Sequence, residues 1–257
     1  MLKRWKGRNI LSFISYSPSE LVLIALIFLF AAFVKGVTGM GFSTTCLPFL
    51  VYAVGLKRGM PLILLPSLAS NFFIMKDAGH FREVLVRFWP MLLATVGGVI
   101  IGLWLLNLVP VIVATTCLGG VLSAYAIFGF FTPNFRLPAK VESILAPVSG
   151  LMTGVLNGLT GSQVMPVLPY LLSLNLNRNE YLQAINCSFS LSTIVMAIGL
   201  YKIGLLEVGA ASITILSLPL VYIGTKLGGR VRNMLPDSVF TSFVHVFLFV
   251  LGASLIF

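Results

Sequence analysis

Long apolar runs, separated by short polar or glycine-containing stretches, dominate this chain from residue 20 to residue 257. A helix that spans a lipid bilayer needs about 20 mostly apolar residues, and most of these runs reach or approach that length. The pattern therefore predicts an all-α, polytopic membrane protein with up to ten hydrophobic segments. These segments are residues 20–34, 42–56, 60–76, 88–107, 111–131, 141–157, 163–174, 181–201, 205–226 and 238–257.

Two short polar stretches interrupt the apolar pattern in the same way. The first, KGVTGMG, occupies residues 35–41, and the second, NGLTGSQ, occupies residues 157–163. A helix that is broken at membrane depth exposes backbone N–H and C=O groups, which hydrocarbon cannot satisfy. Such breaks persist where they line a cavity, and a matched pair in two halves of a chain is typical of a transporter's binding site. We therefore expect the substrate to lie between the two breaks.

The breaks also indicate an internal duplication, because their matching residues keep a constant spacing. The pairs with a separation of 122 positions are Gly36 and Gly158, Thr38 and Thr160, and Gly39 and Gly161. The pairs with a separation of 126 positions are Gly98 and Gly224, Gly102 and Gly228, and Pro110 and Pro236. The Gly-x-x-x-Gly motifs in the second set are typical of helices that approach closely in lipid, so we expect them to pack helices together.

The duplication divides the chain into two transmembrane repeats, residues 20–131 and 141–257. A linker at 132–140 joins them, and a basic tail at 1–19, expected on the cytoplasmic side, precedes them. If each broken pair of segments crosses the membrane once, the chain makes about eight crossings, with ten Lys and Arg on the cytoplasmic side and six opposite. The basic cluster at 226–232 argues against this arrangement, so an odd number of crossings per half, which gives an inverted repeat, stays open.

Composition and charge support the membrane class. Of the 257 residues, 58% are hydrophobic and only 9% are charged, whereas about 25% are charged in soluble domains. The net charge of +10 comes from basic residues scattered over segment ends, which suits anionic lipid headgroups rather than a nucleic acid. The cysteines Cys46, Cys117 and Cys187 form no Cys-x-x-Cys motif, so we expect neither a metal nor a cofactor.

Lys35 is the one charged residue placed deep between two long apolar stretches. Ionisable residues at such positions are costly and usually face a cavity or a partner. An ammonium beside a glycine-rich break, with the start of another helical segment following it, suits a small anion. The alternative is that the long side chain reaches the membrane surface.

Other polar side chains at or near the breaks complete the candidate substrate site. Hydroxyl groups there can instead bond back to the preceding helical turn, and the two isolated asparagines can equally tie helices together. The full candidate set is Lys35, Gly36, Thr38, Gly39, Gly41, Ser43, Asn71, Asn157, Gly158, Thr160, Gly161, Ser162, Gln163 and Asn186.

The chain resembles the sulfite exporter TauE/SafE family over about residues 20–255. The resemblance rests on GVTGMGF at 36–42, on NGLTGSQ at 157–163 with the prolines that follow, and on AINCSF at 184–189. It implies transport of small sulfur-containing or organic anions across the bacterial inner membrane by a multi-pass protein. Ser162 and Gln163 replace the small residues expected at the second break, so the resemblance does not identify a particular substrate.

The sequence thus favours a secondary transporter of small anions that works by alternating access, with one half rocking against the other. An anion channel would use the same two breaks as a filter. An intramembrane enzyme would need a nucleophile with a base or a metal cluster, and no such set is visible in the sequence. A coupling proton or sodium ion and a homodimer also stay open.

Overall fold

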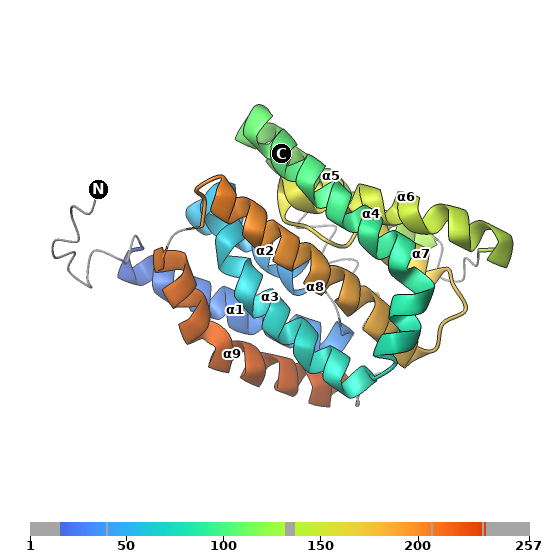
Figure 1. The fold of residues 1–257 in the computed structure, drawn as a ribbon. Helices are drawn as coiled ribbons and strands as arrows, with labels where there is room; N and C mark the ends of the chain where they lie inside the picture. Colours follow the sequence, from blue (N-terminus) through green and yellow to red (C-terminus); the bar gives the residue numbers. More distant parts are fainter. Residues whose placement is uncertain (1–15, 40, 132–136, 207, 233, 235–257) are drawn as a thin grey trace, which may run out of the picture.

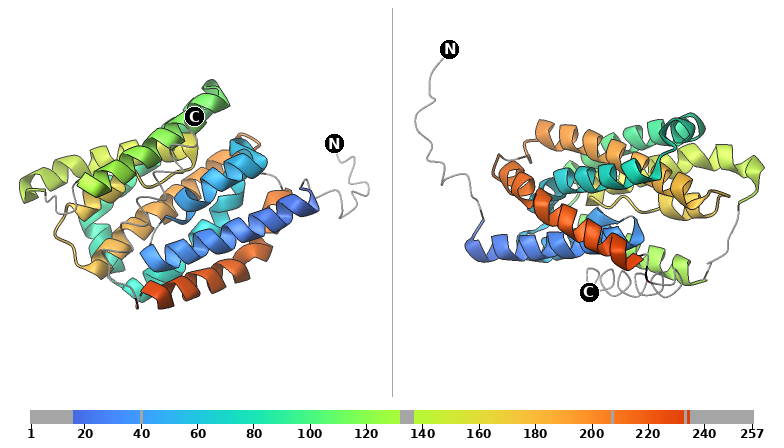
Figure 2. Two further views of the ribbon diagram at one scale, coloured as in Figure 1. Left: turned by 180° about the vertical axis from the view of Figure 1, so that it is seen from behind. Right: turned by 90° about the horizontal axis from the view of Figure 1, so that it is seen from below.

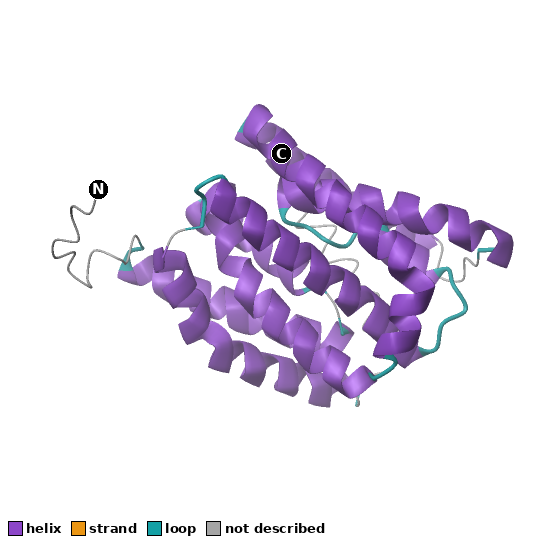
Figure 3. Ribbon diagram, in the orientation of Figure 1, coloured by secondary structure: helices purple, strands orange, loops and turns teal. Residues whose placement is uncertain are grey.

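The chain folds as a bundle of helices. The computed structural model describes residues 16–39, 41–131, 137–206, 208–232 and 234, and within these ranges no strand occurs (Figures 1 and 3). The helices are α1 (Pro18–Thr38), α2 (Phe42–Val54), α3 (Leu56–Ala78), α4 (Phe81–Leu108), α5 (Val111–Phe131), α6 (Ala139–Thr160), α7 (Val167–Leu172), α8 (Arg178–Lys202) and α9 (Val208–Arg232). The all-α class is confirmed. The apolar run 238–257 and most of the basic tail lie outside the described residues.

Six helices are long and apolar enough to cross a membrane, namely α1, α3, α4, α6, α8 and α9. The two helices that follow the breaks are shorter. At 1.5 Å per residue, the 13 residues of α2 span about 20 Å and the 6 residues of α7 span about 9 Å, against a hydrocarbon core of about 30 Å. The chain is therefore a multi-pass membrane protein in which two helices are too short to cross alone.

Polar side chains lie inside the bundle and large apolar side chains lie on its outside. Asn71, Asn157 and Asn186 are wholly buried, whereas Trp89 and Trp104 on α4 are 59% and 61% exposed. An apolar exterior of this kind suits lipid, while polar groups are buried inside the bundle.

The helices α1 and α2 form a hairpin. The ring of Phe30 on α1 packs against that of Phe49 on α2, with 5.9 Å between centroids, so α2 runs back along α1. At the open end of the hairpin, an Arg58 nitrogen at the start of α3 lies 3.7 Å from a Glu20 carboxylate oxygen at the start of α1. The chain therefore returns after α2 to the end of the bundle from which α1 departs. We call this the first end.

The helices α6 and α7 form a second hairpin. The Ser173 carbonyl, just after α7, accepts a hydrogen bond of 2.8 Å from the Leu137 N–H, just before α6. The Tyr170 hydroxyl also donates to the Glu142 carbonyl at 3.1 Å. This hairpin starts at the opposite end of the bundle, where the Arg87 guanidinium at the start of α4 holds the Glu142 carboxylate at 2.7 and 3.0 Å. We call this the second end.

The expectation that each broken pair crosses the membrane once is wrong. Each pair goes in and comes back, because two glycines with positive φ at the first break, and six non-helical residues at the second, let the chain reverse. The longer helices run accordingly: α3 runs from the first end to the second, and α8 runs the other way.

Glycines bring helix backbones into contact in two places. On α9, a Cβ at Gly228 would lie 2.1 Å from the Phe33 carbonyl oxygen of α1; on α4, a Cβ at Gly102 would lie 2.2 Å from the Val155 carbonyl oxygen of α6. The predicted packing role of these glycines is confirmed. In Figures 1 and 2, α1 lies along α9, and α4 lies along α6. Each contact joins a helix of residues 20–131 to a helix of residues 141–257.

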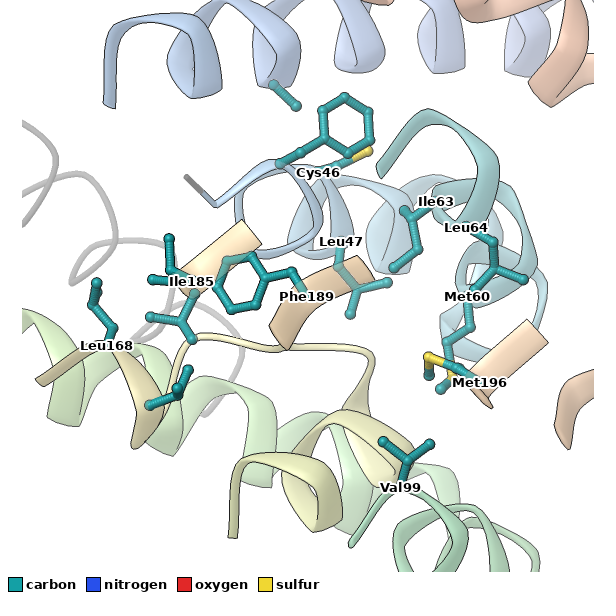
Figure 4. Close-up of a cluster of buried hydrophobic side chains, with 14 of the residues drawn as sticks. Cys46, Leu47, Met60, Ile63, Leu64, Val99, Leu168, Ile185, Phe189 and Met196 are labelled. Atoms are coloured by element: carbon teal, nitrogen blue, oxygen red, sulfur yellow. The ribbon is translucent and has the colours of Figure 1, made fainter. Parts of the chain in front are cut away.

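An apolar core fills the space between the short hairpin helices and the two central helices, α3 and α8. Leu47 of α2, Ile63 of α3 and Phe189 of α8 belong to it, and all three are buried (Figure 4). This core holds α2 against α3 and α8, and so fixes where the first break lies.

Candidate functional site

The first break is short and depends on glycine. Helix α1 continues through Lys35 and Gly36 and ends at Thr38, so these two residues are helical rather than part of the break. Gly39 then adopts φ 78°, and its N–H donates to the Lys35 carbonyl at 2.6 Å. Gly41, with φ 82°, precedes α2. Left-handed backbone at a helix end is typical of glycine, which explains why the chain can turn back here.

The second break repeats this geometry 122 positions later. Helix α6 ends at Thr160, Gly161 adopts φ 79°, and its N–H donates to the Asn157 carbonyl at 2.7 Å. The chain stays non-helical until α7 begins at Val167. Both breaks therefore end the first helix of their hairpin with the same cap.

The two threonines of the breaks bond back to their own helices. The Thr38 hydroxyl donates to the Val34 carbonyl at 2.9 Å, and the Thr160 hydroxyl donates to the Leu156 carbonyl at 2.7 Å. Each hydroxyl proton is thus used within the helix, and the oxygen remains as an acceptor. The Ser162 N–H donates to the Thr160 oxygen in this way, at 3.2 Å.

Lys35 lies inside the bundle rather than at its surface. Its side chain is wholly buried, and its ammonium donates a short hydrogen bond to the Asn71 side-chain oxygen on α3. Asn71 lies 7 residues before the end of α3, so it is about 10 Å inside the bundle from that end of the helix. Among the described residues, every aspartate and glutamate is at least partly exposed. The partner of the buried ammonium is therefore a neutral amide.

The second break contacts the equivalent position of the other central helix. The Gln163 amide nitrogen donates to the Thr193 hydroxyl oxygen on α8 at 2.8 Å, and Thr193 follows Asn71 by 122 positions. The Thr193 hydroxyl proton is already donated to the Phe189 carbonyl at 2.7 Å. In this arrangement the Gln163 nitrogen, rather than its oxygen, faces Thr193.

Asn186 joins helix α8 to the first break. Its amide nitrogen donates to the Gly39 carbonyl at 3.1 Å and to the Leu182 carbonyl at 2.8 Å. Thr193 lies seven residues further along α8, so the two positions share one face of the helix and lie about 10 Å apart. The two breaks therefore meet the same face of α8 at two levels.

Several buried polar atoms around the breaks have no hydrogen-bond partner within the described part of the chain. Three amide oxygens and two amide nitrogens belong to this set, together with hydroxyl groups. The unpaired amide atoms are Asn157 Oδ1, Gln163 Oε1, Asn186 Oδ1, Asn71 Nδ2 and Asn157 Nδ2, and the hydroxyls are those of Thr44, Ser162, Ser188 and Ser192. A buried polar atom without a partner costs about 1–3 kcal/mol, so this concentration of them indicates a place where a ligand or water binds.

The remaining predicted site residues lie elsewhere in the packing. A Cβ at Gly36 would lie 2.2 Å from the Thr225 carbonyl oxygen, and one at Gly158 would lie 2.4 Å from that of Val99. These two glycines therefore face helix–helix contacts. Ser43 is buried and donates to the Ser67 hydroxyl oxygen at 3.1 Å.

Sequence reasoning did not include three polar residues of the central helix α8 in the site. Ser188, Ser192 and Thr193 are buried, with at most 1% exposed. The available signal is that α8 carries hydroxyl side chains in a mainly apolar run, 121 or 122 positions after Ser67 and Asn71 of the first repeat.

One cluster of potential metal ligands occurs within the described ranges, at the second end of the bundle. Ligand atoms of His80, Glu83 and Glu180 lie within 4.8 Å of one another. The groups are already engaged, since His80 Nδ1 lies 2.5 Å from the Glu83 carboxylate and the Glu180 carboxylate accepts the Asn177 N–H at 3.0 Å. They form an exposed cap at the starts of α4 and α8.

The family model of the sulfite exporter TauE/SafE matches residues 24–255 of the chain. The chain belongs to the sulfite exporter TauE/SafE family. No curated protein and no solved structure matches it. The TauE/SafE match spans both breaks and all of the helices described above except the first residues of α1. A TauE/SafE protein is a membrane transporter of small anions, which agrees with the buried lysine.

Proposed function

We propose that the chain is a secondary transporter that moves sulfite, a sulfonate or another small organic anion across the bacterial inner membrane by alternating access. The observation that carries the proposal is Lys35, a wholly buried ammonium whose hydrogen-bond partner among the described residues is the neutral amide of Asn71. A buried charge without a compensating charge is costly. A bound anion would remove that cost.

The rest of the site supplies hydrogen bonds in this proposal. Asn71 Nδ2 lies on the same amide that holds the ammonium, has no partner among the described residues, and can donate to the anion. Gly39, Gly41 and Gly161 give the substrate access to backbone, while Gly36 and Gly158 pack helices. Thr38, Ser43 and Thr160 lie at or near the breaks with their hydroxyl protons bonded within the protein, while the orphaned groups of Asn157, Ser162, Gln163 and Asn186 face the substrate.

We further propose that the two repeats are inverted. The first hairpin starts at the first end and the second hairpin at the second end, and α3 and α8 run in opposite directions. Each repeat would then consist of a hairpin and three crossings: α3, α4 and α5 in the first; α8, α9 and the run 238–257 in the second. An odd number of crossings inverts the second repeat relative to the first.

The sequence predicts that one half of the chain rocks against the other, but the helix packing favours different moving parts. Because α1 packs backbone to backbone on α9, and α6 on α4, residues 20–131 are poorly suited to move as one body. The packing supports two mixed bodies instead, α1 with α9 and α4 with α6. The central helices α3 and α8, which carry the polar residues of the site, lie between them (Figure 1).

The test is a Lys35→Met variant in proteoliposomes that take up radiolabelled sulfite, with Lys76→Met as the control. Lys76 is an exposed lysine on α3. We expect Lys35→Met to lower uptake by about tenfold or more, because a hydrogen bond to a charged group contributes about 1.5–3 kcal/mol. Lys76→Met should keep uptake near the wild-type rate. Wild-type uptake by a folded Lys35→Met protein would show that this lysine does not bind the anion.

A further inference from the structure

The unpaired amide oxygens around the breaks restrict the ligand more than the buried charge does. Asn157 Oδ1, Gln163 Oε1 and Asn186 Oδ1 are buried acceptors without a donor in the described ranges. An acceptor is satisfied only by a hydrogen-bond donor. An ion that presents lone pairs in every direction would leave these oxygens unpaired, so the ligand or its waters must bring protons to them.

The orientation of these amides is determined by their partners. The Asn186 nitrogen faces two carbonyl oxygens, and the Gln163 nitrogen faces a hydroxyl whose proton is used elsewhere. Exchanging nitrogen and oxygen in Asn186 would place its oxygen against two carbonyl oxygens, and in Gln163 it would require the Thr193 hydroxyl to give up its bond to the Phe189 carbonyl. Asn157 lacks partners on both of its amide atoms within the described residues, so it offers one donor and one acceptor whichever way it is turned.

The charge lies at the first break, together with Asn186, whereas the acceptors of Asn157 and Gln163 lie at the second. Lys35 lies on the first hairpin, while Asn157 and Gln163 lie on the second. The contacts of the two breaks along α8, at Asn186 and Thr193, are about 10 Å apart by helix rise. Since a hydrogen bond at each end takes about 3 Å, a ligand that reaches both levels would carry a short carbon chain between an acid group and a second polar group.

We propose that the ligand is a small organic monoanion with a hydroxyl group opposite its acid group. The acid group binds Lys35 and Asn71 at the first break, and the hydroxyl donates to Asn157 or Gln163 at the second. A neutral donor is favoured over an ammonium there because, among the described residues, no buried carboxylate compensates a second positive charge. This inference rests on the proposed anion transport and narrows its substrate class.

The experiment compares anions that differ by one hydroxyl group, on the purified full chain by isothermal titration calorimetry. The matched pairs are 2-hydroxyethanesulfonate with ethanesulfonate, and glycolate with acetate. We expect the hydroxylated member to bind about tenfold or more tightly, because a site built for a hydroxyl discriminates against the analogue that lacks it. The ammonium analogue 2-aminoethanesulfonate should bind no more tightly than ethanesulfonate.

Two variants test whether the second break is the source of the preference for hydroxylated anions. Asn157→Leu and Gln163→Met each remove acceptors at similar volume, and either one should weaken binding of the hydroxylated member more than binding of ethanesulfonate, and so reduce the preference. Asn107→Leu, a change at an exposed position near the end of α4, should keep the preference. Equal affinity for both members of each pair in the wild-type protein, or an undiminished preference in both folded variants, would overturn the inference. Failure of all four anions to bind would instead count against anion transport itself.

Discussion

Single side chains hold the first break to the two central helices, α3 and α8. Asn186 reaches from α8 to the Gly39 carbonyl, and Lys35 reaches from α1 to Asn71. Each of these contacts depends on a group that the bilayer could not replace, since hydrocarbon offers no hydrogen bonds. Removing either contact should therefore destabilise the protein more than removing a similar hydrogen bond at the surface.

At this scale we predict that Asn186→Leu destabilises the protein by about 1–3 kcal/mol, because it leaves the buried Gly39 carbonyl without its donor. The matched control is Asn107→Leu. Asn107 also donates to a carbonyl four residues back, Leu103 at 3.2 Å, but lies on an exposed part of α4. Unfolding in a mixed micelle with increasing denaturing detergent would measure both changes. Similar losses in the two variants would show that the Gly39 contact adds nothing.

Among the helices, adjacent glycines differ sharply in what surrounds them. On α4, a Cβ at Gly98 would lie 2.2 Å from the Leu151 carbonyl oxygen, whereas one at Gly97 would meet nothing within 4 Å. On α9, Gly228 faces the Phe33 carbonyl oxygen at 2.1 Å and Gly229 faces open space. In each adjacent pair, therefore, one glycine lies at the close contact between helices and its neighbour does not.

This contrast predicts opposite effects of the same substitution at neighbouring positions. Gly98→Ala and Gly228→Ala should separate their helix pairs and lower the melting temperature by several degrees. Gly97→Ala and Gly229→Ala should be neutral or stabilising, because alanine is a better helix former by about 1 kcal/mol. Melting curves of the four purified variants would decide the matter. If Gly98→Ala melted like Gly97→Ala, the α4 and α6 backbones could not be as close as described.

For the molecule as a whole, α1 of the first half packs on α9 of the second, and α4 of the first half packs on α6 of the second. This packing determines which distances can change during transport. Spin labels at Leu23 on α1, Leu216 on α9 and Leu93 on α4 all lie at exposed positions. If α1 moves with α9, the distance from 23 to 216 should stay constant while the distance from 23 to 93 changes on addition of sulfite. Double electron–electron resonance, in a protein with the three cysteines replaced, would measure both.

A motion of residues 20–131 against residues 141–257 predicts the reverse. The distance from 23 to 93 would then stay constant, since both labels lie in the first half, and the distance from 23 to 216 would change. The two label pairs therefore separate the mixed-body motion from the half-against-half motion without any assumption about the size of the movement.

The sequence by itself determined the class of the protein, the positions of the breaks and the family. These depend on local properties: run length and apolarity predict spanning helices, glycine next to polar residues predicts a break, and a constant spacing of 122 positions relates the breaks. The glycines at 98, 102, 224 and 228 were also predicted as packing positions. None of this requires knowing which helices touch.

Only the tertiary structure decided the direction of the chain after each break and the partners of the polar residues. A glycine permits a turn without specifying its direction, and the packing of Phe30 on Phe49 decides that α2 runs back along α1. The pairing of Lys35 with Asn71, the placement of Asn186 on Gly39, and the unpaired oxygens of Asn157 and Gln163 likewise arise from residues far apart in the chain. Such contacts depend on how the helices are arranged in space, which no local pattern encodes.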